Sequence, residues 1–182
     1  MVQITRFLSV LSVAAVGLAL SLKRDVAKVE SDIATISTQV TTLDNAIEAY
    51  PTSGGTLVAA LGIHTDATNL VTTLNGATTD ATANGALDET DARTILNSVE
   101  ALEPTILDAL TDIVVKKPAF AALPIGGIPA LILQDLKNLK TATVAFAGAL
   151  ISAAPADLTA EATQLQNNIT AAFDPAIAAY SS

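Results

Sequence analysis

The chain has 182 residues, of which 51% are hydrophobic and only 3% aromatic, and its 18 Asp and Glu against 9 Lys and Arg give a formal net charge of −9 at pH 7. This acidic balance argues against nucleic acid and anionic membranes as partners, because both are bound through basic patches. The sequence has no cysteine and one histidine, which excludes a disulfide framework and leaves too few ligands for a structural metal site. The length suits one domain that is stabilised by packing alone.

The N-terminal residues differ in pattern from the rest of the chain. Arg6 precedes an uncharged apolar stretch over residues 7–20, with the small residue Ala19 near its end. This order is typical of a secretory signal peptide. The stretch is also shorter than the about 20 residues that span a bilayer. We therefore predict a signal peptide over residues 1–19 and no transmembrane segment.

A dibasic pair, Lys23 and Arg24, stands between this signal and the first amphipathic pattern. Processing proteases of the secretory pathway cut after such pairs, so residues 20–24 are expected to be a short pro-segment and residues 25–182 the mature domain. The alternative is that the two residues are only solvated charges. From Asp25 onward, six Lys and Arg face all 18 Asp and Glu, which gives a net charge of −12.

The first predicted helix carries an aliphatic residue at alternating steps of three and four and must end before Pro51. This heptad spacing is typical of one long amphipathic helix. Its buried stripe consists of Val26, Val29, Ile33, Ile36, Val40, Leu43 and Ile47. A second helix is expected from about residue 56 to residue 83, after a turn at Gly54 and Gly55. Its apolar arc consists of Leu57, Leu61, Ile63, Leu70, Val71 and Leu74, and His64 lies within that arc.

The third predicted helix starts at Asp88, a good N-cap residue, and contains Pro104 in its interior. Because a proline ring clashes with the preceding turn, this helix should bend or break near Leu102. Its apolar face consists of Ala92, Ile95, Val99, Leu102, Ile106, Leu110 and Ile113. The following residues 116–129 contain three prolines and two glycines and are expected to form a structured connector, a lid with Phe120 at the mouth of a cavity.

Two further helices complete the expected fold. The fourth starts near Pro129, ends before Pro155 and buries Ile132, Leu136, Leu139, Thr143, Phe146 and Leu150. The fifth buries Leu158, Ala162, Leu165, Ile169, Phe173 and Tyr180, and Pro175 is expected to kink its last turns. Short turns join consecutive segments, which implies antiparallel neighbours. The sequence therefore predicts an all-α fold, an antiparallel bundle of about five long amphipathic helices with one helix kinked at Pro104.

His64 is the one candidate for acid–base chemistry. No Ser or Thr lies in a nucleophile motif, so we expect this imidazole to be hydrogen-bonded inside the bundle or to contact a lipid head group, without catalysis. The acidic run at Asp88 lacks the ligand register of a calcium loop, and no cofactor or metal is expected. Asn168 begins the single Asn-X-Thr sequon and is a candidate glycosylation site.

Four short motifs resemble one known family. They are Asp25-Val-Ala-Lys-Val-Glu-Ser-Asp-Ile-Ala, Lys116-Lys-Pro-Ala-Phe120, Leu136-Lys-Asn-Leu139-Lys140-Thr-Ala-Thr and Ala-Ala-Phe173-Asp-Pro-Ala-Ile177-Ala-Ala-Tyr180. The chain resembles the fungal hydrophobic surface binding protein A family, also called the cell wall galactomannoprotein family, over nearly all of the mature domain. The resemblance implies a secreted, cell-wall-associated helical bundle that binds and does not catalyse.

Two roles follow from this resemblance. One is binding of fatty acids, of another apolar ligand or of hydrophobic surfaces through the apolar interior of the bundle. The alternative is a structural or adaptor protein of the cell wall that recruits a secreted esterase such as cutinase to apolar surfaces. From the apolar pattern we expect these ligand-contacting residues: Leu61, His64, Ile106, Leu110, Phe120, Leu136, Leu139, Phe146 and Phe173.

Overall fold

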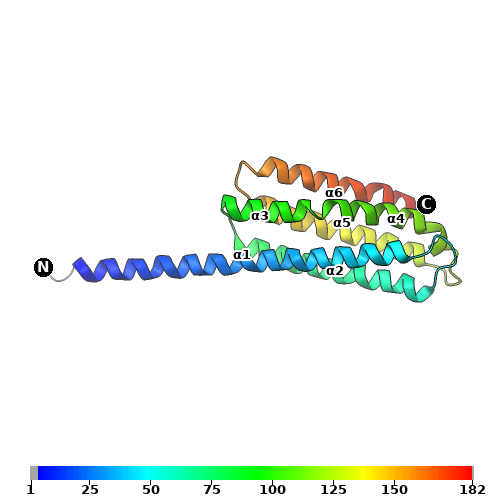
Figure 1. Cartoon of the computed structure of the whole chain (residues 1–182), viewed down its shortest axis with the longest axis horizontal. Helices are drawn as coiled ribbons and strands as arrows, with labels where there is room; N and C mark the ends of the chain where they lie inside the picture. Colours follow the sequence, from blue (N-terminus) through cyan, green and yellow to red (C-terminus); the bar gives the residue numbers. More distant parts are fainter. Residues whose placement is uncertain (1–3, 182) are drawn as a thin grey trace.

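The computed structural model describes the backbone of residues 4–181 and the side chains of residues 26–181. This part of the chain contains six helices and no strand: α1 (Ile4–Ala49), α2 (Leu57–Asn84), α3 (Glu89–Glu100), α4 (Glu103–Ala121), α5 (Ile128–Ala153) and α6 (Thr159–Tyr180). Figure 1 shows α3 and α4 following one another along one rod, so the helices form five rods lying side by side. The all-α bundle predicted from the sequence is confirmed.

The rods are arranged in a closed ring. α2 packs between α1 and α5, α6 packs between α5 and α4, and the rod of α3 and α4 returns to α1. Consecutive rods run antiparallel, as expected, but α2 lies parallel to α5 and α4 lies parallel to both α6 and α1. The links after α2 and after α4 therefore cross the two ends of the ring.

The end of α1 and the start of α2 each have a local cause. α1 ends at Ala49, just before Pro51, which removes a backbone donor, and the chain turns at Gly54 with φ 73°. Thr56 then caps α2, because its side chain accepts a hydrogen bond from the backbone N–H of Ala59.

The third rod breaks where its proline predicts. α3 ends at Glu100 and α4 begins at Glu103, so that Pro104 occupies the first turn of α4, where its missing N–H costs nothing. Asp88 caps α3 by accepting a hydrogen bond from the backbone N–H of Asp91 at 2.9 Å. Both sequence predictions for this rod are confirmed.

The predicted connector over residues 116–129 is wrong for its first half. α4 continues through Pro118 to Ala121, and only residues 122–127 link it to α5. Ala119 and Phe120 are buried against the core, and their packing offsets the backbone hydrogen bond that Pro118 cannot donate. Phe120 therefore belongs to a helix and not to a lid.

α6 continues through Pro175 to Tyr180, and the kink expected at Pro175 stays a prediction. The Tyr180 hydroxyl donates a hydrogen bond to the backbone carbonyl of Ile113 at 2.7 Å and ties the last turn of α6 to α4. Lys117 donates from its ammonium group to the carbonyl of Ala179 at 2.5 Å, which satisfies a terminal carbonyl of the same helix.

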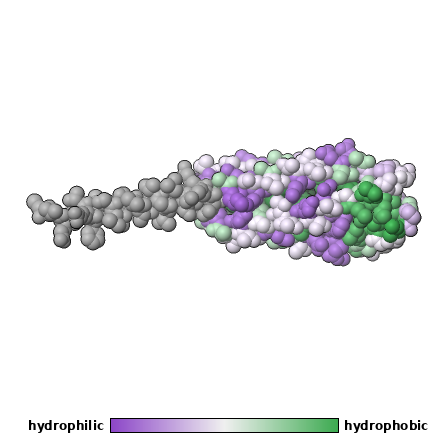
Figure 2. Space-filling model, turned by 90° about the horizontal axis from the view of Figure 1, so that it is seen from below, coloured by the Kyte–Doolittle hydropathy of each residue, from purple (hydrophilic) through white to green (hydrophobic). Residues whose placement is uncertain are grey.

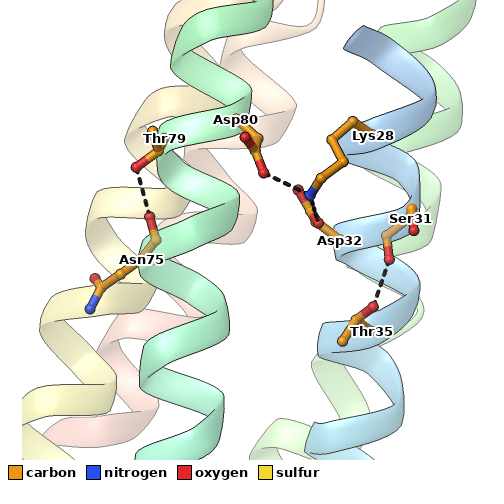
Figure 3. Close-up of polar contacts among 7 residues, drawn as sticks. All are labelled: Lys28, Ser31, Asp32, Thr35, Asn75, Thr79 and Asp80. Carbon is orange, nitrogen blue, oxygen red and sulfur yellow. Dashed lines mark hydrogen bonds and ion pairs between the residues drawn. The ribbon is translucent and has the colours of Figure 1, made fainter. Parts of the chain in front are cut away.

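Polar contacts on the outside of the bundle join α1 to α2. Figure 3 shows the Lys28 ammonium between the carboxylates of Asp32 and Asp80, at 2.5 Å and 2.7 Å. The threonines of these helices donate their hydroxyls to the carbonyl four residues earlier, as Thr35 does to Ser31 and Thr79 does to Asn75. The threonine-rich outer faces therefore leave few hydroxyls without a partner. Within the described residues, no helix is both long and apolar enough to cross a membrane.

Candidate ligand-binding cavity

The ring of helices encloses a cavity of about 150 Å³, to which all six helices contribute side chains. Protein interiors are close-packed, and their voids are rarely larger than a water molecule. A cavity of this size in the centre of a bundle is therefore a candidate binding site.

Aliphatic and phenylalanine side chains form nearly all of the cavity lining. Among the side chains of residues 26–181, the lining includes three polar ones, those of Asp135, Thr143 and Gln166, and it includes no Lys or Arg. Apolar cavities of this kind stay dry and take up apolar molecules. The chemistry of the lining therefore selects a ligand with a hydrocarbon body.

The heptad stripe of α1 forms one wall of the cavity. The first and last lining residues of this helix, Ile33 and Ile47, are 14 steps apart, which is a length of about 21 Å at 1.5 Å per residue. The cavity is thus a channel along the bundle axis. The sequence analysis assigned this stripe to helix packing and missed its position at the site, although the stripe was the signal that could have found it.

The broken third rod supplies the neighbouring wall, because the rod of α3 and α4 packs against α1. Leu102 lies at the break, and Ile106 and Leu110 follow it on the inner face of α4, so that lining residues continue across the break. The break therefore preserves the apolar wall while the helix direction changes.

Six of the nine residues that we expected to contact a ligand lie in the cavity lining. They are Ile106, Leu110, Leu136, Leu139, Phe146 and Phe173. They come from α4, α5 and α6, and each had been placed on the inner face of its helix by the apolar periodicity. Their contact with a ligand stays a prediction.

Phe120 lies outside the lining, at the end of the bundle. Its ring stacks on that of Tyr50, with the centroids 4.1 Å apart and the planes 13° from parallel, and it is 1% exposed. Burial raises the pKa of the Tyr50 hydroxyl above its usual value. The pair closes the end of the ring where α1 and α4 end.

Leu61 also lies outside the lining. Its side chain is 42% exposed in the second turn of α2, so it faces solvent and not the cavity. The apolar arc predicted for α2 was too wide at this point, because a short periodic pattern does not fix which edge of the arc is buried.

His64 is partly exposed and contacts Asp135 of α5. Its Nδ1 lies 3.0 Å and 2.9 Å from the two carboxylate oxygens of Asp135. Burial raises the pKa of Asp135 above its ordinary value, and the hydrogen bond from His64 opposes part of that increase. Sequence analysis missed Asp135, although an acid on the same face of α5 as Ile132 and Leu136 was a visible departure from the apolar pattern.

The far end of the cavity is covered by the links between helices. Leu87, in the link between α2 and α3, lines the cavity, and its backbone N–H donates to the carbonyl of Ala153 at 2.9 Å. Leu158, just before α6, is also a lining residue and is fully buried. Neither was expected to contact a ligand.

The remaining expected sites lie away from the cavity. Asn168 is exposed on α6, and its glycosylation stays a prediction. Ala19, Lys23 and Arg24 fall outside the residues whose side chains the structure describes, so signal-peptide cleavage and dibasic processing also stay predictions. In the part of the chain with described side chains, no group of three or more His, Cys, Asp or Glu could hold a metal ion.

Comparisons with known proteins add to this geometry. The sequence model of the family described as "Hydrophobic surface binding protein A" matches residues 26–152. Cell wall mannoprotein 1 of Aspergillus fumigatus is 31% identical over 148 residues, which are 81% of this chain and 49% of that protein. The protein of the same name from Aspergillus flavus is 28% identical over 148 residues, which are 81% of this chain and 51% of that protein. The chain thus spans about half the length of these relatives.

Solved structures share the fold. The crystal structure of Afmp4p in complex with palmitic acid superposes with a TM-score of 0.79 at 32% identity and covers 85% of this chain and 99% of that chain. Ligand binding domain 1 of the Penicillium marneffei MP1 protein, complexed with arachidonic acids, gives a TM-score of 0.78 at 21% identity and covers 87% of this chain and 99% of that chain. At that identity the second structure supports the fold alone.

Proposed function

Because this chain belongs to the hydrophobic surface binding protein A family, we propose that it binds a fatty acid, or another lipid with one long acyl chain, inside the cavity of its helical ring. The observation that carries the proposal is the continuous apolar channel of about 150 Å³. The 32% identical Afmp4p, whose structure was determined with palmitic acid, supports it.

The size of the cavity suits an acyl chain. One water molecule needs about 10–15 Å³ of such a cavity, so 150 Å³ holds on the order of ten groups of that size. A methylene group is about as large as a water molecule. The channel therefore has room for much of a long acyl chain in an extended form.

The energetics favour the chain over a smaller ligand. Each methylene group removed from water contributes about 0.8 kcal/mol, so ten of them contribute about 8 kcal/mol before the cost of association and ordering is subtracted. The cavity is already formed, which keeps the ordering cost on the protein side small. We expect affinity to increase with acyl chain length until the channel is full.

The position of the head group follows from the charges of the lining. As far as the side chains are described, the lining contains no Lys or Arg and has Asp135 as its one acidic side chain. A buried ionised carboxylate would therefore have no cation to pair with and would pay its full desolvation cost. We propose that the hydrocarbon chain lies inside the channel and that an ionised carboxylate stays in contact with water.

We also propose an extracellular or cell-wall location, which the names of the Aspergillus relatives support.

We propose a binding protein and not an enzyme, because Asp135 occupies Nδ1 of His64 and no hydroxyl is bonded to this imidazole among the described side chains. An assay on ester substrates tests this: turnover that disappears in His64→Ala would contradict it. Recruitment of a secreted esterase stays a prediction from the family resemblance.

The proposed function is tested by filling the channel. Leu139 lies in the lining, so Leu139→Trp should reduce the affinity for a fluorescent long-chain fatty acid at least tenfold, about 1.4 kcal/mol. Leu61→Trp makes the same substitution outside the lining and should bind as tightly as the parent. Circular dichroism confirms that both variants are folded. Equal affinity of folded Leu139→Trp and the parent would place the ligand elsewhere.

A further inference from the structure

The carboxylate of Asp135 has hydrogen-bonding capacity that the protein itself does not use. Asp135 lines the channel and is 9% exposed, and His64 is the one group that hydrogen-bonds it among the described residues. Both contacts involve the same Nδ1, which carries a single hydrogen, whereas an ionised carboxylate can accept about four hydrogen bonds. Acceptor sites therefore remain for a ligand in the channel.

No basic side chain in the lining pairs with this carboxylate. Lys137, two residues along α5, is exposed and is not a lining residue. Lys116 and Lys117 of α4 donate to the terminal carbonyls of α1 and α6, and neither lines the channel. Burial raises the pKa of Asp135, which reflects the poor solvation of its charged form. A cation or a hydrogen-bond donor supplied by a ligand would restore part of that solvation.

Asp135 lies near one end of the channel. It comes one turn after Ile132, the first lining residue of α5, and 16 residues before Ile151, the last lining residue of that helix, which is about 24 Å. Between Asp135 and Ile151, the lining residues of α5 are apolar except for Thr143. A ligand with its head group at Asp135 can therefore extend a hydrocarbon chain along the rest of the channel.

Water reaches this end of the channel at the contact between α2 and α5. The side chain of His64 is 34% exposed and that of Asp135 is 12% exposed. Leu61, one turn before His64, is 42% exposed. Figure 2 shows a hydrophobic area at the end of the bundle opposite the N-terminus of the chain, which is the end where α2 begins in Figure 1. An amphiphilic ligand arriving here would meet apolar side chains close to a partly hydrated acidic group.

We propose that Asp135 binds the head group of a long-chain lipid that donates hydrogen bonds, an amine or an alcohol, and that the channel prefers such a lipid to an ionised fatty acid of the same length. An ammonium group has three hydrogens to donate and the charge opposite to that of Asp135, whereas a hydroxyl group donates one hydrogen. Charge-assisted hydrogen bonds are roughly twice as strong as neutral ones, so the amine should bind more tightly than the alcohol. The inference rests on the proposed function of the channel and adds head-group selectivity to it.

An ionised fatty acid has the wrong head group for Asp135. Its carboxylate only accepts hydrogen bonds, and two carboxylates that share a site repel each other. Such a ligand binds through its hydrocarbon chain and keeps its carboxylate in water, away from Asp135. If Asp135 served only to hold His64, the channel would not distinguish these head groups.

Three ligands of matched chain length test the proposal: dodecylamine, 1-dodecanol and dodecanoic acid. At about pH 8 the free amine is protonated and the free acid is ionised. Calorimetric titration of the whole protein, with each ligand kept below the concentration at which it forms micelles, measures the three Kd values. The parent should bind the amine most tightly and the acid most weakly, with at least a tenfold difference between them.

Asp135→Asn removes the charge and keeps a carbonyl oxygen that can accept the hydrogen bond from His64. It should weaken the binding of dodecylamine at least tenfold and should bind dodecanoic acid at least as tightly as the parent. Glu30→Gln is the matched control, because Glu30 is exposed on α1, lies outside the lining and changes the net charge by the same amount. This variant should keep the parent order of affinities, and circular dichroism checks that both variants are folded.

Three results would overturn the proposal: equal affinities of the parent for all three ligands, an Asp135→Asn protein that keeps the parent order, or a Glu30→Gln protein that loses the preference for the amine. Leu139→Trp separates this inference from the proposed function, because filling the channel should weaken all three ligands. Equal affinities that Leu139→Trp weakens together would contradict only the role of Asp135. No saturable binding of any ligand to the parent would contradict both the channel and the role of Asp135.

Discussion

At the scale of single residues, Gly55 is required by the side chain packed against it. A Cβ atom added at this position would lie 2.2 Å from Cζ and from the hydroxyl oxygen of Tyr50. Tyr50 cannot easily move away, because it is fully buried and stacked on Phe120. The turn between α1 and α2 thus closes directly over this aromatic pair.

Gly55→Ala should therefore destabilise the protein by about 1–3 kcal/mol, the usual cost of overpacking. Gly62→Ala is the control, since nothing lies within 4 Å of its added Cβ in α2, and it should stabilise the protein by roughly 0.5–1 kcal/mol. Urea unfolding of the three proteins measures both changes. A Gly55→Ala protein as stable as the parent would mean that Tyr50 is free to move.

Asp135 is an acidic side chain in the otherwise largely apolar lining of the cavity. Burial raises its pKa above 3.8 despite the hydrogen bond from His64, so the folded state holds the proton more tightly than the unfolded state. The contribution of this group to stability is then complete below pH 3.8 and is lost as the pH rises through the raised pKa.

Asp135→Asn removes this titration while keeping a side chain that can bond His64. The difference in the free energy of unfolding, parent minus variant, should fall as the pH increases from below 3.8 through the raised pKa and should then level off. Thermal unfolding of both proteins between about pH 3 and pH 7 measures it. A difference that rises with pH would mean that the ion pair with His64 outweighs burial.

Helical periodicity predicts the buried side of a residue in the middle of a long helix better than near a helix end. Periodicity placed Leu136, Leu139 and Phe146 correctly on the inner face of α5, because a long regular helix fixes its own buried side. Leu61 and Phe120 were misplaced, since each lies near a helix end, where the boundary of the helix and its contacts with other segments decide the environment. The apolar residues that line the cavity are determined by how all the helices of the ring pack together, which periodicity within one helix does not predict.

At the scale of elements, capping residues determine where helices begin and end more reliably than prolines do. Asp88 starts α3 where the sequence predicts, and Pro104 separates α3 from α4. Pro118 and Pro175 lie inside helices that continue past them. The cost of each is offset by tertiary contacts of nearby side chains, including the bond from Tyr180 to Ile113, which no local pattern reveals.

Asp88→Ala should destabilise the protein by about 1 kcal/mol, because the backbone N–H of Asp91 loses its acceptor. Asp88→Asn keeps an acceptor oxygen and should lose at most a few tenths of a kcal/mol, from the weaker interaction with the helix dipole. Chemical denaturation separates the two variants. Equal losses in both would assign the effect to charge and not to the cap.

At the scale of the whole molecule, the order of the rods creates the channel. Short turns predicted that consecutive rods pack together, yet α2 packs on α5 and α4 packs on α6. This arrangement depends on which inner faces match over their full length, and such matching is not encoded in any single segment. The closed ring leaves axial space that the aliphatic side chains line without filling.

A ligand held in this space should stabilise the entire fold. At a free concentration of 100 times Kd, binding adds about 2.7 kcal/mol. For a chain of this size that corresponds to an increase in Tm of roughly 5–10 °C. Calorimetry with and without palmitic acid measures the shift, and Leu139→Trp should show a much smaller one at the same concentration. An equal shift in that variant would point to binding outside the channel.

A crystal structure of this protein grown with palmitic acid would show directly whether the channel holds the ligand. We expect one extended stretch of density along the bundle axis, in contact with Ile36, Leu110 and Leu139, with the carboxylate reaching water. Density for the acid on the outer surface, or a channel closed by repacked side chains, would contradict it.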